Sequence, residues 1–146
     1  MRRLALGPKL ALGIAGWISL GGAAPVASLE IDVAGLRSTS GLIQLCLTAN
    51  PDKFPSCTGD ARALTRTVPA GQGQLRFAAL PQGDWAVAVI HDANGNGRLD
   101  TVMGIPREGF GFSNNPAIGF GAPRFAAARF RLGGDASETI RMRYLL

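Results

Sequence analysis

Histidine and cysteine are scarce in this sequence, which contains one histidine, His91, and two cysteines, Cys46 and Cys57. A four-ligand zinc site would need carboxylates to complete it, so the composition disfavours a zinc protein. Charged residues make up 17% of the chain, against about 25% in an average globular chain. With 47% apolar residues, the chain is neither disordered nor a polyelectrolyte. Its 146 residues suit one folded domain and exclude a multidomain enzyme.

Positive charge is concentrated at the N-terminus. The formal net charge is +5, and Arg2, Arg3 and Lys9 supply three of these charges, so the rest of the chain carries only +2. This small excess argues against a nucleic-acid partner. The basic residues precede an uncharged apolar run over residues 10–20 and small residues over 21–27. This is the three-part layout of a secretory signal peptide.

We therefore expect residues 1–27 to be a signal peptide, cleaved between about residues 23 and 27. The apolar run is about half of the roughly 20 residues that a spanning helix needs, so we expect no stable membrane span after cleavage. Residues 28–146 would then form a single exported domain, either in the periplasm or in the extracellular medium.

An exported domain permits a disulfide, and we expect one between Cys46 and Cys57. Closing a loop of about a dozen residues would constrain the unfolded chain and stabilise the fold by roughly 2–3 kcal/mol. The alternative is a pair of free or metal-binding thiols.

Alternation of apolar and polar residues predicts seven short strands. Cys46 alternates with Leu45 and Leu47, so it should point away from the core, toward the loop that carries Cys57. The turn Gly133-Gly134-Asp135 separates the last two segments and predicts a terminal hairpin. No helical stretch follows the signal peptide, which favours an all-β antiparallel sandwich. The expected strands fall at about residues 29–33, 43–47, 62–68, 75–77, 85–90, 128–132 and 140–144.

One connection is unusually long. Residues 92–124 show little strand pattern and are rich in glycine. Irregular connections of this length are uncommon in compact domains and are usually functional or held in place by a ligand. The functional surface is therefore expected here.

The segment Leu80-Pro81-Gln82-Gly83-Asp84-Trp85-Ala86-Val87 resembles a turn-and-strand signature of transthyretin-like and collagen-binding-B-like sandwich modules. Together with the stretches 91–100 and 104–115 that follow, the chain resembles the bacterial domain-of-unknown-function family 2141 from about Leu29 to its final strand. The resemblance implies an exported protein with a seven-stranded immunoglobulin-like or transthyretin-like β-sandwich, and implies no established activity. Trp85 stands where such modules more often carry tyrosine, so a tyrosine-type corner hydrogen bond is not implied.

A frame of oxygen-bearing side chains opens the long connection. The pattern D-x-N-x-N-G-x-x-D suits a hard cation such as Ca²⁺, because alternate residues aim oxygens inward while the glycine bends the backbone. The twelfth position of the frame is Met103 rather than glutamate, so this is no EF-hand, and Glu108 or a main-chain carbonyl would have to complete the shell. The expected ligands, with weak affinity, are Asp92, Asn94, Asn96, Arg98 and Asp100. The alternative is a plain turn held by Asx-type hydrogen bonds, with Gly95 and Gly97 at positive φ.

His91 is the only side chain that ordinarily titrates near neutrality, so any general-base mechanism would start from it. No companion catalytic residue is evident, and the alternative is a histidine packed at the end of a strand. The chain also lacks the several histidines and the C-terminal tail of the transthyretin-like hydrolases. A small hydrolase that uses His91 is therefore kept only as a rival to a non-enzymatic protein.

Two further groups of residues are candidate contact surfaces. Arginines at 129, 131, 141 and 143 fall on one side of the predicted terminal hairpin and suit an anionic glycan or phosphate, or simple solvation of an exposed sheet. Aromatic residues interleaved with glycine could line a groove for sugar or peptide, or could pin the long connection to the sandwich. The expected ligand surface is Phe110, Phe112, Ser113, Asn114 and Asn115, with Phe120 nearby.

Taken together, these residues indicate a non-enzymatic, exported β-sandwich protein that binds a glycan or another envelope component through the long connection. No cofactor other than Ca²⁺ is expected. An adhesive module that binds anionic glycan through its arginines is the second rival.

Overall fold

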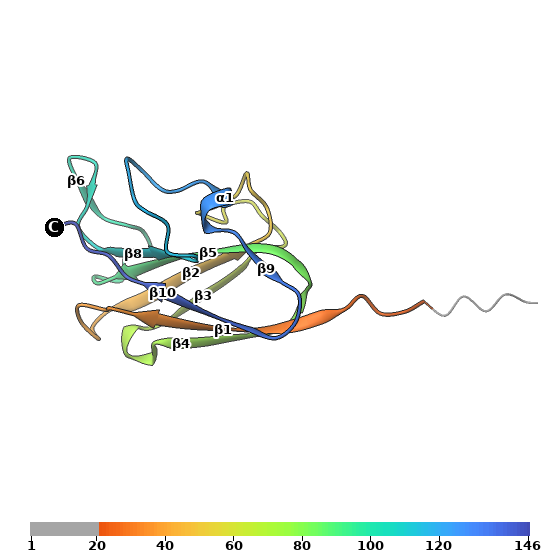
Figure 1. Ribbon diagram of the computed structural model, residues 1–146. Coiled ribbons are helices and arrows are strands. Elements are labelled where there is room, and N and C mark those ends of the chain that lie inside the picture. Colours follow the sequence, from red (N-terminus) through yellow and green to blue (C-terminus); the bar gives the residue numbers. More distant parts are fainter. Residues whose placement is uncertain (1–20) are drawn as a thin grey trace, which may run out of the picture.

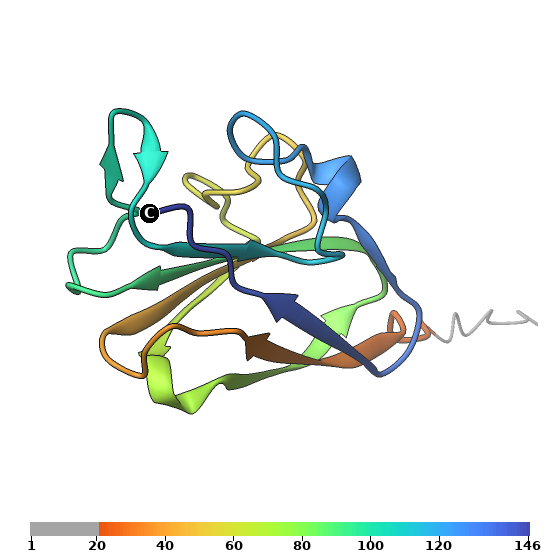
Figure 2. The same ribbon diagram turned by 60° about the vertical axis from the view of Figure 1, so that its left-hand side comes forward.

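The computed structural model describes residues 21–146, so most of the predicted signal peptide lies outside the described residues. Within this range no helix is long and apolar enough to cross a membrane. The fold is all-β, as expected, and Figure 1 and Figure 2 show two main layers of strands.

The smaller layer has the strand order β10-β1-β4 and consists of β1 (Val26–Ala34), β4 (Gln74–Pro81) and β10 (Ala136–Arg141). The larger layer has the order β3-β2-β5-β8 and consists of β2 (Leu42–Thr48), β3 (Leu64–Pro69), β5 (Gly83–Asp92) and β8 (Gly109–Phe112), with β9 (Phe130–Leu132) paired to the start of β5. A separate hairpin joins β6 (Thr101–Val102) to β7 (Ile105–Pro106). Two short helices, η1 (Ala70–Gln72) and α1 (Phe125–Ala128), complete the described chain.

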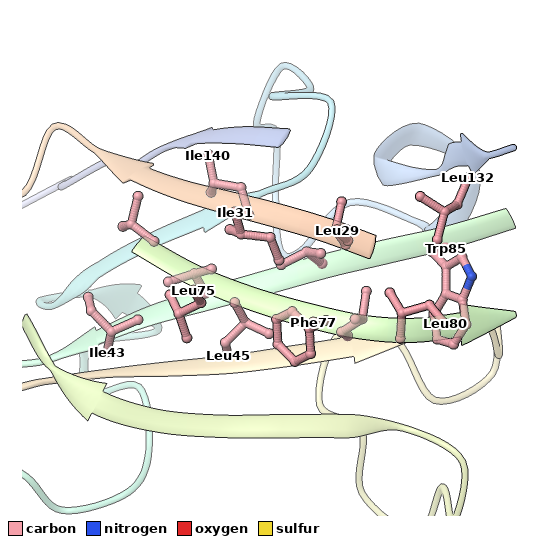
Figure 3. Close-up of a cluster of buried hydrophobic side chains, with 14 of the residues drawn as sticks. Leu29, Ile31, Ile43, Leu45, Leu75, Phe77, Leu80, Trp85, Leu132 and Ile140 are labelled. Atoms are coloured by element: carbon pink, nitrogen blue, oxygen red, sulfur yellow. The ribbon is translucent and has the colours of Figure 1, made fainter. Parts of the chain in front are cut away.

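Apolar side chains from the two layers fill the space between them (Figure 3). Alternate residues of β1 face inward, and Leu29 and Ile31 are fully buried. They pack with Leu45 of β2 and Phe77 of β4 in one core. The period-two pattern that predicted these strands therefore marks the inner face of the sandwich.

The connection between β4 and β5 carries the chain from one layer to the other. Trp85 follows this turn, and its indole Nε1 donates a hydrogen bond to the Pro81 carbonyl oxygen at 2.9 Å. A corner hydrogen bond is thus present, with an indole as the donor.

The predicted terminal hairpin is wrong. β9 pairs antiparallel with β5 in the larger layer, whereas β10 pairs parallel with β1 in the smaller one. The intervening Gly133-Gly134-Asp135 crosses between the layers, and Asp135 accepts a hydrogen bond from the Ser28 N–H at 2.7 Å. Leu132 and Ile140 are both fully buried. Each strand therefore turns its apolar residues toward the core, but from a different sheet.

Two further expectations, the number of strands and the irregular structure of residues 92–124, are also wrong. The described chain has ten strands rather than seven, and not all of them are antiparallel. Three of the ten, β6, β7 and β8, lie within residues 92–124, and β8 belongs to the larger sheet.

Glycines at alternate positions of β8 remove the apolar–polar alternation by which the other strands were predicted. A Cβ on Gly111 would lie 2.7 Å from Cγ2 of Ile140 and 3.1 Å from the carbonyl oxygen of Arg141, while one on Gly109 would clash with the ring of Tyr144. The close approach of the C-terminal segment therefore requires glycine at the inward positions. Phe110 and Phe112 occupy the alternate positions on the other face.

The first strand begins earlier than predicted. β1 includes Val26 and Ala27, which pair with Pro81 and Leu80 of β4, and Ala27 is 4% exposed. These residues fall within the predicted cleavage range, so part of that range belongs to the folded sheet.

Candidate functional site

The connection after β5 is organised around the carboxylate of Asp92, which is fully buried at the end of that strand. Its Oδ1 accepts hydrogen bonds from the N–H groups of Gly95 and Asn96 at 2.8 and 3.1 Å. Its Oδ2 accepts from Gly97 N–H at 2.8 Å and from Nε2 of Gln44 at 2.6 Å. Four donors therefore converge on one carboxylate.

These donors outweigh the cost of burial. Burial by itself raises the pKa of the Asp92 carboxyl group, but the hydrogen bonds from Gly97, Gln44, Asn96 and Gly95 hold the pKa below its ordinary value of 3.8. Gly95 and Gly97 adopt φ values of 73° and 85°, a conformation that glycine takes without steric cost. Asp92 is therefore ionised at neutral pH and fixes the backbone of the turn.

The other side chains of the frame gather around Asp100. Its Oδ1 accepts from Nδ2 of Asn96 at 2.8 Å, and its Oδ2 accepts from Nδ2 of Asn94 at 2.6 Å. These two bonds, the largest contributions, lower the pKa of Asp100. Arg98 extends outward, with its side chain 80% exposed and its Nε 4.0 Å from the Asp100 carboxylate.

Glu108 joins the two ends of this loop. Its Oε1 accepts from the Ala93 N–H at 2.9 Å, and its Oε2 accepts from the Asp100 N–H at 3.0 Å. Glu108 thus lies beside both ends of the frame and satisfies a backbone N–H group at each. Among residues 21–146, no three His, Cys, Asp or Glu side chains form a cluster that could hold a metal ion.

His91 lies on the inner side of the same strand end and is 3% exposed. Its Nε2 lies 2.7 Å from the Ser40 carbonyl oxygen, so Nε2 carries a proton and donates. Its Nδ1 lies 2.7 Å from Oη of Tyr144, which donates to it. Tyr144 Oη also accepts from the Arg37 N–H at 3.0 Å. Both ring nitrogens of His91 are therefore engaged, Nδ1 with the C-terminal segment through Tyr144 and Nε2 with the segment before β2 through Ser40.

Most of the predicted ligand surface is buried. Phe110 and Phe112 are 5% and 7% exposed, and Ser113 is fully buried. The Ser113 Oγ accepts from the Val87 N–H at 2.8 Å and donates to the Ala128 carbonyl oxygen at 2.5 Å. These three side chains are thus internal anchors, and the expectation that they form an exposed surface has to be revised.

The two asparagines that follow are anchors of the same kind. Asn114 is exposed, and its Nδ2 donates to the Ala127 carbonyl oxygen at 3.0 Å. Asn115 pairs with the backbone of β10: its Nδ2 donates to the Thr139 carbonyl oxygen, and its Oδ1 accepts from the Arg141 N–H, both at 2.8 Å. Residues 113–115 therefore tie the end of β8 to three neighbouring segments.

A second apolar cluster lies on the outer face of the larger sheet. The disulfide between Cys46 and Cys57, which confirms the predicted pairing, belongs to it together with Phe112. The ring of Phe54 makes edge-to-face contacts with Phe112 at 5.9 Å and with Phe125 at 6.1 Å between centroids. This cluster pins the disulfide loop against the segment that leads into α1.

An open depression of about 700 Å³ lies between these two segments. Apolar side chains of Phe54 and Phe125 line it, together with Arg124, Arg129 and Asp84. The sequence analysis missed this site, because its walls come from residues about seventy positions apart. The aromatic residue Phe54 inside a disulfide loop was the one available signal.

The four arginines do not share a hairpin face. Arg131 lies on β9 and Arg129 directly precedes that strand; the two guanidinium groups pair with the carboxylate oxygens of Asp84, Arg129 at 3.5 Å and Arg131 at 3.4 Å. Arg141 ends β10 in the other sheet, and the backbone of Arg143 pairs with Phe110 of β8. Of these four arginines, Arg129 lines the depression.

Comparison with protein families gives a match over most of the chain. The model of a family described as "Uncharacterized protein conserved in bacteria (DUF2141)" matches residues 31–141. The chain belongs to this family. Neither a curated protein nor a solved structure matches the chain. The match begins within β1 and ends with the last residue of β10, so membership extends over both sheets and the Asp92 loop.

Proposed function

We propose that this member of the DUF2141 family is an exported, non-enzymatic module that binds an anionic envelope glycan. The N-terminal pattern of residues 1–27 and the Cys46–Cys57 disulfide support export. The observation that carries the binding proposal is the depression beside the disulfide loop. Small-ligand sites are typically concave and mostly apolar, with a few charged groups that orient the ligand.

The walls of the depression suit a sugar polymer with negative charges. Phe54 and Phe125, with neighbouring prolines, supply apolar surface for the faces of sugar rings. Arg124 and Arg129 supply donors for carboxylate or sulfate groups. Asp84 balances part of this charge, since it pairs with Arg129.

The walls are also held in place before any ligand arrives. The disulfide and the edge-to-face contacts of Phe54 fix the two segments relative to each other. A preorganised surface loses little conformational entropy on binding.

The experiment is a binding titration of the purified protein with a soluble polyuronate, with neutral dextran as the reference polymer. Replacing Arg124 and Arg129 together by glutamine should weaken polyuronate binding about tenfold or more at physiological salt, because each removes a charge-assisted hydrogen bond. Replacing Arg141 and Arg143 together is the matched control and should leave binding unchanged. Equal losses in the two double variants, or equal binding of dextran, would remove the proposal.

The non-enzymatic part of the proposal is supported by His91. A general base needs a free nitrogen within reach of the substrate, whereas both nitrogens of this buried ring hold Ser40 and Tyr144. A hydrolase activity that is lost when His91 is changed to glutamine, in a protein that remains folded, would restore the enzymatic rival.

Weak calcium binding by the Asp92 loop is a second candidate function. The observation that favours it is the convergence of Asn94 and Asn96 on the Asp100 carboxylate, which gathers three side chains of the predicted frame. Rotating the two side-chain amides by half a turn would point their Oδ1 atoms, instead of their Nδ2 atoms, toward the Asp100 carboxylate, where a cation would bind. The Asp92 oxygens already accept four hydrogen bonds, so Asp100 and Glu108 would supply the charge.

Calorimetric titration with Ca²⁺ tests this candidate. Binding is expected with a Kd on the order of 10⁻⁴ to 10⁻³ M, as in extracellular modules with few carboxylates. It should disappear in the Asp100→Asn variant and persist in Asp84→Asn. Absence of both heat and a thermal shift at millimolar calcium would leave the loop as a turn held by its own hydrogen bonds.

A further inference from the structure

The hairpin of β6 and β7 exposes apolar side chains at its tip. Met103 is 97% exposed, and the neighbouring Val102 and Ile105 are 44% and 45% exposed. In Figure 1 and Figure 2 the hairpin extends away from the two sheets. Leu145 and Leu146 at the C-terminus are about half exposed, and the C-terminus lies beside the base of the hairpin in both views. Clustered exposed apolar residues mark contact surfaces.

The turn at the tip gives methionine no local reason to be there. Val102 pairs with Ile105, so Met103 and Gly104 form a two-residue turn, with φ values of 51° and 80°. Such turns favour asparagine, aspartate or glycine at the first position, because a positive φ is costly for other side chains. Met103 thus adopts an unfavourable backbone conformation and packs against nothing in residues 21–146. Its apolar side chain is available for a contact outside this part of the chain.

Exposed basic side chains lie at the base of the hairpin, while the nearby acidic ones are buried or hydrogen-bonded. Arg98 and Arg107 flank the hairpin and are exposed. Asp92 and Glu108 are buried, and Asp100, which stays partly exposed, accepts hydrogen bonds from two asparagines. The exposed Arg143 adds a further positive charge near the hairpin base. The exposed side chains at the hairpin base therefore carry mostly positive charge.

We propose that the β6–β7 hairpin inserts its tip into the interface of a lipid bilayer that carries anionic headgroups. A convex apolar tip with an arginine rim matches such a surface, since the apolar residues enter the acyl boundary and the arginines contact the headgroups. The hairpin is a projecting ribbon, so a protein partner would need a deep groove to cover it. The inference goes beyond glycan binding, which uses a different surface, and it does not depend on calcium.

The test is co-sedimentation of the purified full chain with phosphatidylcholine vesicles, with and without phosphatidylglycerol, in buffer with a metal chelator. The N-terminal segment is the same in every variant, so differences report the hairpin. Wild type should bind vesicles with phosphatidylglycerol more tightly. Met103→Asn suits the turn and should weaken binding on the order of tenfold, with the melting temperature unchanged or raised. Changing Arg98 and Arg107 to glutamine should weaken binding roughly fivefold for each residue.

Phe120→Ser is the matched control, because Phe120 is fully exposed on another loop; this variant should bind like wild type. Wild-type binding that is equally tight with and without phosphatidylglycerol, or an affinity in Met103→Asn equal to that of wild type, would overturn the proposal. So would a wild-type protein that sediments as a dimer in the absence of lipid while Met103→Asn sediments as a monomer, because the tip would then contact a second copy of the chain.

Discussion

Residues 92–113 form the first part of the connection between β5 and α1 and fall into an exposed half and a buried half. Both contain glycines, yet the two halves are ordered by opposite means. Residues 92–107 lie largely at the surface and are held by hydrogen bonds to the carboxylates of Asp92 and Glu108. Residues 108–113 are buried, with Phe110 and Phe112 packed on one side and glycines against the C-terminal segment on the other. Glycine serves a polar turn in the first half and close packing in the second.

The largest effect should come from the buried half. Phe112→Ala should reduce the free energy of unfolding by about 3–5 kcal/mol, because it leaves a cavity beside Phe54 and the disulfide. Urea denaturation measures this loss. The exposed Phe120→Ser should change stability by no more than about 0.5 kcal/mol. A similar small loss for Phe112→Ala would mean that this half is not held by burial.

Most residues of the exposed half lie at the surface, yet its stability should depend strongly on one buried carboxylate, that of Asp92. Asp92→Asn replaces an oxygen that accepts two hydrogen bonds by an NH₂ group and removes the charge. The expected loss is about 1.5–3 kcal/mol in unfolding free energy. Asp52→Asn, which changes an exposed carboxylate, is the control and should be nearly neutral. Equal stability of the two variants in thermal unfolding would show that the carboxylate does not order the turn.

The glycines of β8 should tolerate no side chain. Gly111→Ala should cost about 1–3 kcal/mol, because the new Cβ overlaps Ile140 and the Arg141 carbonyl oxygen. Gly119 has open space at its Cβ and no positive φ, so Gly119→Ala should have little effect. Thermal melts of the two variants compare them directly, and equal melting temperatures would contradict the close approach of the C-terminal segment to β8.

The smallest expected effect is a decrease in the free energy of unfolding at acidic pH. The folded-state pKa of Asp92 is lower than in the unfolded chain, so its stabilising contribution is full above the unfolded value near 3.8. The contribution shrinks as the pH falls below that value and is lost below the folded-state pKa. Asp60 and Asp100, whose pKa values are also lowered by hydrogen bonds, act in the same direction.

Urea unfolding from pH 7 to pH 3 checks this dependence. The stability difference between wild type and Asp92→Asn should narrow with acid. A difference that stays constant over this range would mean that the pKa of Asp92 does not shift on folding.

Sequence patterns predicted the inner strands and the disulfide well. Leu29 and Ile31, like Leu45 and Leu47, alternate with polar or outward residues because one face of each sheet is buried. Cys46 points outward, as its place in this alternation required. In the polar frame, the side-chain oxygens of Asp92, Asn94 and Asn96 accept hydrogen bonds from backbone N–H groups two or three residues on. Such Asx-type bonds act over a few residues, so this local pattern can be read from the sequence.

The remaining features could not be read in this way. Alternation shows that Leu132 and Ile140 face a core, but not that their strands belong to different sheets. The glycines of β8 have meaning only once Tyr144 and Ile140 lie against them. Equally, the depression between Phe54 and Phe125 exists because the disulfide loop and α1 meet in space.

What the sequence alone determined is local: which residues face inward, where the chain turns, and which two cysteines lie near enough to join. These properties follow from the period of a strand and from the short reach of a side chain. The tertiary structure decided the partner of each strand, the use of each glycine, and the place where aromatic and arginine side chains meet. Such choices depend on the packing of segments distant in the chain, because a buried surface is complete only when both of its sides are present.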